Sequence, residues 1–169
     1  MFDGTNSHER VQTLDGKRVF YAGTGCGNIV CINVNDGTPI WRWQVSKGGI
    51  NASPVIFKDK LICVHGAENF DTTETGRLFA IRYPTDLDAV GGKVEEGQGG
   101  APQLPADIEA WRYTFEQFTS SPLLVDGKVY QMDKTGLLIC VDAETGKVLW
   151  QRKLANEQLK SLDRLKDDF

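Results

Sequence analysis

The same strand–turn–strand pattern occurs twice in this chain, and this repetition is the feature that most constrains the fold. Residues 136–154 (GLLICVDAETGKVLWQRKL) align without a gap over residues 27–45 (GNIVCINVNDGTPIWRWQV). In each copy an apolar run is followed by a polar turn containing Asp and Gly, and then by a second β-prone run. Each copy therefore predicts a β-hairpin. A third copy begins at residues 76–83 (GRLFAIRY), is interrupted by a glycine-rich insertion and resumes at residues 110–112.

A second pair of matching segments precedes the hairpins. Residues 51–65 (NASPVIFKDKLICVH) and 119–132 (TSSPLLVDGKVYQM) both contain Ser-Pro, a short apolar strand, a turn with Asp and Lys, and another strand. Residues 11–21 (VQTLDGKRVFY) have the same form without Ser-Pro. Each unit therefore consists of four short strands. The repeat period is about 40 residues once the insertion is removed, which is typical of antiparallel all-β repeat folds.

The repeats divide the chain into a long β region between two different ends. We expect the units at residues 11–45, 51–115 and 118–154, with an insertion at 84–108 in the second unit, between a disordered segment 1–10 and a C-terminal segment 155–169. The glycine-rich stretch 91–100 (GGKVEEGQGG) has little to pack and should be mobile.

The last fifteen residues differ in character from the repeats. Leu159, Leu162, Leu165 and Phe169 form a helical apolar stripe with charges between them. This pattern predicts a short amphipathic helix. Such a helix could cap the exposed face of the last repeat, and the alternative is a frayed tail.

Charge and hydropathy exclude some classes of partner. A formal net charge of -4 and a pI near 5.2 argue against nucleic acids and anionic membranes. No apolar run approaches the roughly 20 residues of a transmembrane helix. The first residues lack the apolar core of a signal peptide, so nothing in this sequence directs export, and the compartment stays open.

The four cysteines are expected to be reduced. Cys31 and Cys140 occupy equivalent places in two repeats, where each serves as a small apolar side chain and lies too far from the other for a disulfide. Cys26 and Cys63 remain, and a disulfide between them is the alternative.

The repeats resemble those of the quinoprotein-like, or pyrroloquinoline quinone (PQQ)-like, β-propellers. This family includes quinoprotein alcohol dehydrogenases and the non-catalytic BamB outer-membrane assembly scaffold. The resemblance rests on the pattern AxxGxxxW, which is matched by Ala143, Gly146 and Trp150 and partly by Val34, Gly37 and Trp41. It implies radial four-stranded blades, usually eight. In that fold, Trp41, Trp111 and Trp150 would occupy equivalent positions and pack between neighbouring blades; the alternative is that each Trp fills its own blade.

The sequence departs from this family in two respects. Three blades cannot close a ring, since propellers have at least four, so we expect a homo-oligomer or a truncated piece of a longer propeller. The adjacent-cysteine disulfide of the catalytic branch is absent, because no two cysteines are neighbours. No cluster of acidic residues and Asn matches that branch's calcium site. Quinone chemistry is therefore not expected.

A possible metal site lies in the loop 66–76 (GAENFDTTETG). Glu68, Asn69, Asp71 and Glu74 could offer oxygen ligands to Ca²⁺. Their spacing does not match the EF-hand loop, and the same residue types form ordinary turns. A turn is the alternative interpretation.

Other chemically interesting residues have structural explanations. His65 has only His8 as a second histidine, so no catalytic base or metal cluster is predicted. Ser53 and Ser121 precede prolines at equivalent strand starts, which the repeat geometry explains. The YAGTGCG stretch (21–27) is followed by a strand rather than by a helix N-terminus, which argues against phosphate binding.

The functional hypothesis is a non-catalytic scaffold, similar to BamB, that binds another protein through exposed edges or loops or associates with itself. We expect no enzyme activity and no cofactor. One alternative is a fragment of a PQQ-dependent dehydrogenase, with PQQ and Ca²⁺ bound in a closed assembly. A second alternative is a module that binds carbohydrate or another small ligand. Relatives in this family are often periplasmic or exported.

Overall fold

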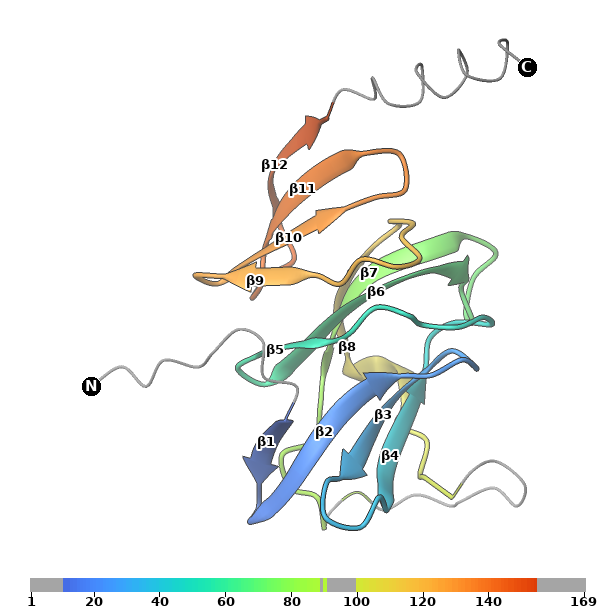
Figure 1. The fold of residues 1–169 in the computed structure, drawn as a ribbon, viewed down its shortest axis with the longest axis vertical. Coiled ribbons are helices and arrows are strands. Elements are labelled where there is room, and N and C mark those ends of the chain that lie inside the picture. The colour runs from blue at the N-terminus through green and yellow to red at the C-terminus, as the bar shows by residue number, and fades with distance from the viewer. Residues whose placement is uncertain (1–10, 89, 91–99, 155–169) are drawn as a thin grey trace, which may run out of the picture.

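The computed structural model describes residues 11–88, 90 and 100–154, which form an all-β structure of three four-stranded antiparallel sheets (Figure 1). This confirms the predicted fold class. The predicted disordered segment 1–10, the mobile stretch 91–99 and the helix at 155–169 lie outside the described residues.

Each sheet is formed by consecutive strands joined by short turns. Sheet 1 contains β1 (Val11–Leu14), β2 (Lys17–Gly23), β3 (Asn28–Asn33) and β4 (Pro39–Gln44). Sheet 2 contains β5 (Val55–Phe57), β6 (Lys60–Glu68), β7 (Thr75–Arg82) and β8 (Glu109–Tyr113). Sheet 3 contains β9 (Leu123–Val125), β10 (Lys128–Met132), β11 (Leu137–Asp142) and β12 (Val148–Lys153). A short 3-10 helix, η1 (Ala106–Ile108), precedes β8.

The three sheets share one strand register. Trp41 in β4 pairs with Cys31, Trp111 in β8 pairs with Ala80, and Trp150 in β12 pairs with Cys140. The pairing shifts by a bulge directly beyond each of these pairs. All three Trp side chains therefore start from the same position of their sheets, on the fourth strand.

The turn between β6 and β7 is shorter than the sequence indicated. The predicted loop 66–76 reduces to residues 69–74, because β6 continues to Glu68 and β7 begins at Thr75. An irregularity between His65 and Glu68 accommodates one extra residue on β6 and lets the pairing resume with Glu68 opposite Thr75.

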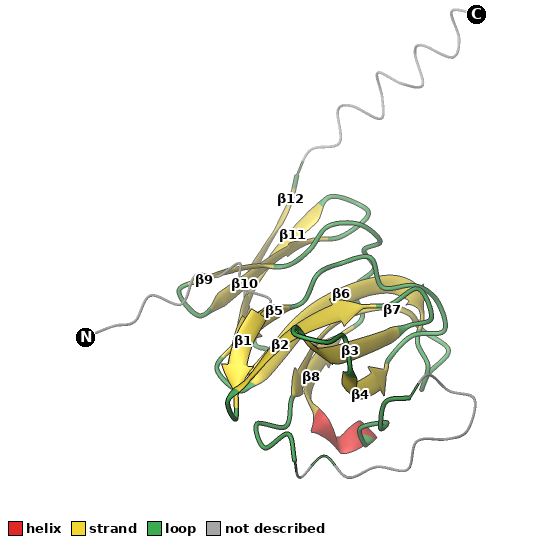
Figure 2. Cartoon of the chain, turned by 60° about the horizontal axis from the view of Figure 1, so that its bottom comes forward, coloured by secondary structure: helices red, strands yellow, loops and turns green. Residues whose placement is uncertain are grey.

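The insertion between β7 and β8 returns to sheet 1. The N–H of Arg42 donates to the carbonyl of Pro102 (2.9 Å), and the N–H of Leu104 donates to the carbonyl of Arg42 (2.8 Å). Residues 102–104 thus lie parallel to the outer edge of β4, and η1 follows at the same end of the molecule (Figure 2). Leu104 and Ala101 are buried. This part of the insertion is packed against the sheet.

The core lies between facing sheets. Tyr21 of sheet 1 packs against Tyr83, which follows β7, with ring centroids 5.3 Å apart. Trp43 of sheet 1 packs against Phe79 of sheet 2 at 5.6 Å. The four cysteines are free thiols; Cys26 is exposed and the other three are buried.

Candidate protein-interaction surfaces

Sheets 2 and 3 are joined by the side chain of Trp111. Its indole N–H donates a hydrogen bond to the carbonyl oxygen of Ala143, 3.2 Å away, in the turn between β11 and β12. The ring covers Gly146 so closely that a Cβ atom there would lie 2.5 Å from Trp111 Cγ. Gly146 also has a φ of 74°, which favours glycine. The turn of sheet 3 is therefore shaped to receive the Trp of sheet 2.

Ion pairs reinforce the same joint. Glu144 contacts Lys58 Nζ at 2.8 Å and Lys60 Nζ at 2.5 Å. Hydrogen bonds from these two ammonium groups lower the pKa of Glu144 to about 2. The Lys60 side chain is buried and also contacts Asp59 at 2.8 Å, so its charge is paired on both sides.

The two predicted Ser residues also lie at this joint. The N–H of Ser53 donates to Ser121 Oγ at 2.8 Å. The hydroxyl of Ser121 thus links sheets 2 and 3.

The joint between sheets 1 and 2 is built differently. One backbone hydrogen bond recurs in all three sheets and identifies equivalent positions. Its donors in sheets 1, 2 and 3 are the N–H groups of Val34, Tyr83 and Ala143, and its acceptors are the carbonyls of Arg18, Asp59 and Gly127, respectively. Tyr83 of sheet 2 is therefore the counterpart of Ala143 in sheet 3. Trp41 is fully buried against Tyr21, with ring centroids 5.6 Å apart, but its indole N–H has no hydrogen-bond partner in the described structure. The insertion starts directly after Tyr83 and replaces the turn that would supply the acceptor.

Trp150 occupies the third equivalent position, and no described sheet covers it. Its side chain is 40% exposed and rests on Tyr130, with ring centroids 5.9 Å apart. The same face of the sheet carries further apolar residues. We define the sheet 3 end face as Leu123, Val125, Tyr130, Met132, Leu138 and Trp150.

In sheet 2, the equivalent face is covered by the next sheet. Leu123 and Met132 are 45% and 37% exposed, whereas their counterparts Val55 and Val64 in sheet 2 are 8% and 0% exposed. The counterparts are buried because sheet 3 packs on that side of sheet 2. The sheet 3 end face is therefore an apolar surface of a type that a further sheet covers within this chain.

Sheet 1 also has an uncovered face, on the side of the sheet that carries a receiving turn rather than a Trp. We define the sheet 1 end face as Phe20, Ala22, Val30, Ile32 and the turn from Val34 to Gly37. Its four strand residues are partly exposed, whereas their counterparts in sheet 3, Val129, Gln131, Ile139 and Val141, are buried. A Cβ placed on Gly37 would meet nothing within 4 Å. Gly37 has the same φ as Gly146, 74°, but no Trp covers it in this chain.

Comparisons with known proteins agree with this architecture. Residues 103–165 match the family described as outer membrane protein assembly factor BamB. The BamB protein of Yersinia pestis is 23% identical over 173 residues, which cover 85% of this chain and 43% of that protein. The repeats are thus similar to those of the PQQ-like β-propeller family. The sheets are accordingly blades of the propeller type, and the chain spans less than half the length of this relative.

The solved structure of a BamB protein shows the same fold. The crystal structure of BamB from Moraxella catarrhalis superposes with a TM-score of 0.52 at 20% identity, covering 87% of this chain and 37% of that one. The quinohemoprotein alcohol dehydrogenase ADHIIG from Pseudomonas putida HK5 gives a TM-score of 0.48 at 20% identity, covering 83% and 19% of the two chains.

The predicted Ca²⁺ ligands do not converge. Glu68 pairs with Lys47, and Asp71 pairs with Arg77 and Arg112. The Asn69 side-chain amide donates to the Glu74 carbonyl, and the Glu74 carboxylate accepts from Thr114 Oγ1. Across residues 11–88, 90 and 100–154, no group of three or more His, Cys, Asp or Glu side chains is placed to hold a metal ion.

Sequence reasoning missed Arg77. Its guanidinium is buried and bonds Asp71 and Glu109, the latter at 3.1 Å. Burial raises the pKa of Glu109 above its ordinary value. Arg77 borders a cavity of about 380 Å³ that also contacts Trp43 and the exposed Phe70. The only sequence signal was a single Arg that opens the apolar run of β7.

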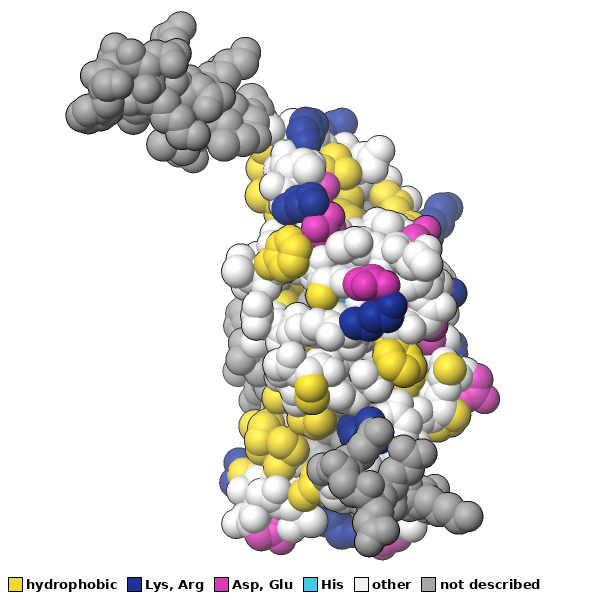
Figure 3. Space-filling view, turned by 90° about the vertical axis from the view of Figure 1, so that its right-hand side faces the viewer, with side chains coloured by type: hydrophobic (Ala, Val, Ile, Leu, Met, Phe, Trp, Pro, Cys, Tyr) yellow, Lys and Arg dark blue, Asp and Glu magenta, His cyan; other side chains and the backbone are white. Residues whose placement is uncertain are grey.

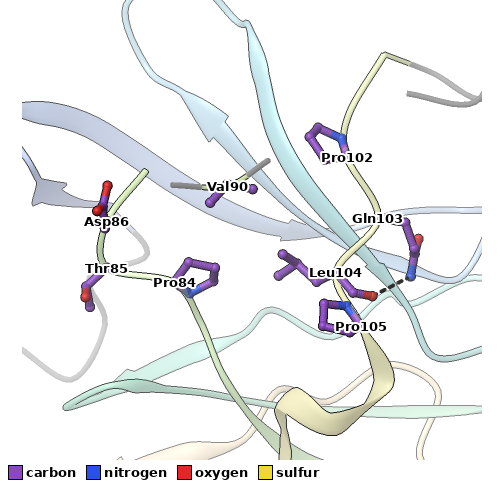
Figure 4. A pocket seen from close by; sticks show the side chains of 8 residues that line it. All are labelled: Pro84, Thr85, Asp86, Val90, Pro102, Gln103, Leu104 and Pro105. Atoms are coloured by element: carbon purple, nitrogen blue, oxygen red, sulfur yellow. Dashed lines mark hydrogen bonds between the residues drawn. The ribbon is translucent and has the colours of Figure 1, made fainter. Parts of the chain in front are cut away.

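A second cavity, of about 370 Å³, lies between the two ends of the insertion (Figure 4). Pro84, Pro102 and Pro105 surround Leu104, and the Gln103 amide donates to the Leu104 carbonyl at 3.3 Å. These residues support the strand-like segment on β4.

The remaining surface is mixed. On the side that faces right in Figure 1, apolar side chains lie in several separate groups between charged side chains and atoms of other side chains or the backbone (Figure 3). None of the helical residues within the described ranges forms a segment that could cross a bilayer.

Proposed function

We propose that this PQQ-like chain is a non-catalytic scaffold of the BamB type that binds an extended segment of a partner protein along the outer edge of β12. The observation that carries the proposal is the pairing of residues 102–104 with β4. There the N–H and C=O of one residue, Arg42, both bond an extended peptide that joins the sheet in parallel. The chain thus already contains one example of strand addition to the outer edge of a blade.

Gln151 is the residue of β12 that corresponds to Arg42. Arg42 follows Trp41 and pairs with Val30, and Gln151 follows Trp150 and pairs with Ile139. Because the registers match, the N–H and C=O of Gln151 point away from β11, as those of Arg42 point away from β3. The neighbouring side chain of Leu149 is exposed and can contact a bound peptide.

The similarity to BamB supports a role in protein assembly. BamB is described as an outer membrane protein assembly factor, and the match to its family covers the whole of sheet 3. Strand addition relies on main-chain hydrogen bonds, so it accommodates partners of varied sequence. This property suits a scaffold that holds unfolded or extended chains.

A labelled peptide with the sequence of residues 101–106 (APQLPA) tests the proposal by fluorescence anisotropy. We expect saturable binding to the 169-residue chain. Gln151→Pro should abolish binding, because Pro removes the outward N–H while leaving the ladder bonds to β11 intact. Gln151→Ala keeps the N–H and should bind normally. Equal binding by the Pro and Ala variants, or no saturable binding to the unmodified chain, would contradict strand addition at β12.

A further inference from the structure

The two end faces have the features of the two halves of one joint. The sheet 3 end face presents an uncovered Trp on the fourth strand, as sheet 2 presents Trp111 to sheet 3. The sheet 1 end face presents the turn that corresponds to the one receiving Trp111, with Val34 in place of Ala143 and Gly37 in place of Gly146. Within the described ranges, each chain therefore carries one Trp without a receiving turn and one receiving turn without a Trp.

We propose that two copies of this chain associate head to tail, with Trp150 of each copy packed over the turn from Val34 to Gly37 of the other. By analogy with the internal joint, the Trp150 indole N–H donates to the Val34 carbonyl. The indole ring covers Gly37, where the described structure leaves open space.

One ion pair of the internal joint also has a counterpart of the same sign in this arrangement. Lys60, which pairs with Glu144 at the internal joint, corresponds in register to Lys128 on sheet 3. Glu144 corresponds to Asn35, which is followed by Asp36 on the exposed turn of sheet 1. Head-to-tail contact brings Lys128 of one copy toward Asp36 of the other. Asp126 stands where sheet 2 has Lys58, so only one of the two internal ion pairs with Glu144 has a counterpart there.

The number of blades in a closed propeller favours two copies. Propellers contain about four to eight blades. Two chains of three sheets supply six blades, whereas three chains would supply nine. A head-to-tail contact that closes after two copies forms two identical joints and leaves no end face open. The contact uses the faces of the end sheets and leaves the outer edge of β12 free, so it is independent of the peptide binding proposed above.

Sedimentation or light scattering of the full chain tests the association. We expect twice the chain mass of 18.7 kDa. Trp150→Lys removes the inserted ring, and Gly37→Asn adds a side chain where the ring must lie while tolerating the positive φ. Each variant alone should have the mass of one chain. Near-ultraviolet circular dichroism and melting temperature verify that both are folded.

The decisive measurement mixes the two variants. The Lys variant retains an intact receiving turn and the Asn variant an intact Trp150, so an equimolar mixture can form one correct joint, and a two-chain species should reappear. A self-matching contact of two sheet 3 end faces predicts instead that Gly37→Asn alone remains dimeric and that the mixture gains nothing. That result, or a wild-type chain that stays at 18.7 kDa at the highest attainable concentration, would overturn the proposal.

Discussion

Trp111 and Gly146 are in direct contact although they belong to different sheets. A Cβ on Gly146 would lie 2.5 Å from Cγ of the indole, which shows that the absence of a side chain on one sheet admits the largest side chain of the next. Gly37 has the same φ and the same place in sheet 1, but nothing lies within 4 Å of its Cβ position. The two glycines therefore separate the effect of backbone conformation from the effect of packing.

Replacing each glycine by Ala measures these effects. Gly37→Ala should lower the free energy of unfolding by about 1 kcal/mol, because Ala disfavours positive φ. Gly146→Ala carries the same backbone cost and in addition displaces Trp111, so we expect a further loss of about 1–3 kcal/mol. Urea denaturation at a concentration where the chain is monomeric gives both values. Equal losses would show that the Trp111 ring does not depend on Gly146.

His65 should make stability depend on pH. Its ring is 1% exposed, and burial, followed by the charge of Arg77, lowers its pKa to about 4. The unfolded His has a pKa of about 6.5, so between these values the unfolded chain binds a proton that the folded chain does not. The free energy of unfolding should therefore be fully retained above pH 6.5 and fall by up to about 3 kcal/mol as the pH decreases to 4.

Denaturation curves of wild type and His65→Phe between pH 7 and 4 isolate this effect. The variant lacks the titrating group and keeps an aromatic ring next to Phe79. Its stability should decline less over this range. Parallel declines in the two proteins would mean that other groups account for the acid sensitivity.

Arg77 should tolerate no replacement by Lys. Its two terminal nitrogens bond different carboxylates, those of Asp71 and Glu109, and an ammonium group cannot match this forked geometry. Arg77→Lys should destabilise the fold by about 2–4 kcal/mol, since the cation at this buried position can no longer pair with both carboxylates. Arg112→Lys is the matched control, because that side chain is about half exposed and pairs with the same two carboxylates. A loss in the control as large as that in Arg77→Lys would refute a special role for burial.

Gly66 and Phe118 should be energetically coupled. A Cβ on Gly66 would approach the Phe118 ring to 2.7 Å, and this contact joins β6 to the segment that leads into sheet 3. Gly66→Ala should cost about 1–2 kcal/mol in the wild-type background. It should cost clearly less in a Phe118→Ala background, where the space is free. A double-mutant cycle measures the coupling, and additive losses would show that the ring moves away without cost.

The regular features of this fold could be predicted from the sequence because they repeat. Three copies of one strand pattern, each with a Trp at the same place, predicted the four-stranded units, which the described structure confirms. The same pattern predicted a resemblance to the PQQ-like propellers, which the comparisons support. The Ca²⁺ site remains a prediction. Its candidate ligands do not converge; their side chains bond other protein groups instead, as seen for Glu68, Asn69, Asp71 and Glu74.

Features that occur only once could not be predicted in this way. The pairing of residues 102–104 with β4 depends on contacts between segments about 60 residues apart, for which a Gly- and Pro-rich sequence gives no periodic signal. The burial of Arg77 depends on carboxylates from the β6–β7 turn and from β8 that converge only after folding.

The insertion also determines which sheets separate together during unfolding. It leaves sheet 2 after β7, fastens to β4 of sheet 1 through Arg42 and returns to sheet 2 as β8. Neither of the first two sheets can therefore separate without releasing this strap, whereas sheet 3 is joined through the Trp111 contact and its neighbouring ion pairs. Amide protons of β4 and β7 should accordingly exchange with solvent in one cooperative event, and those of β10 and β11 in an earlier and separate one.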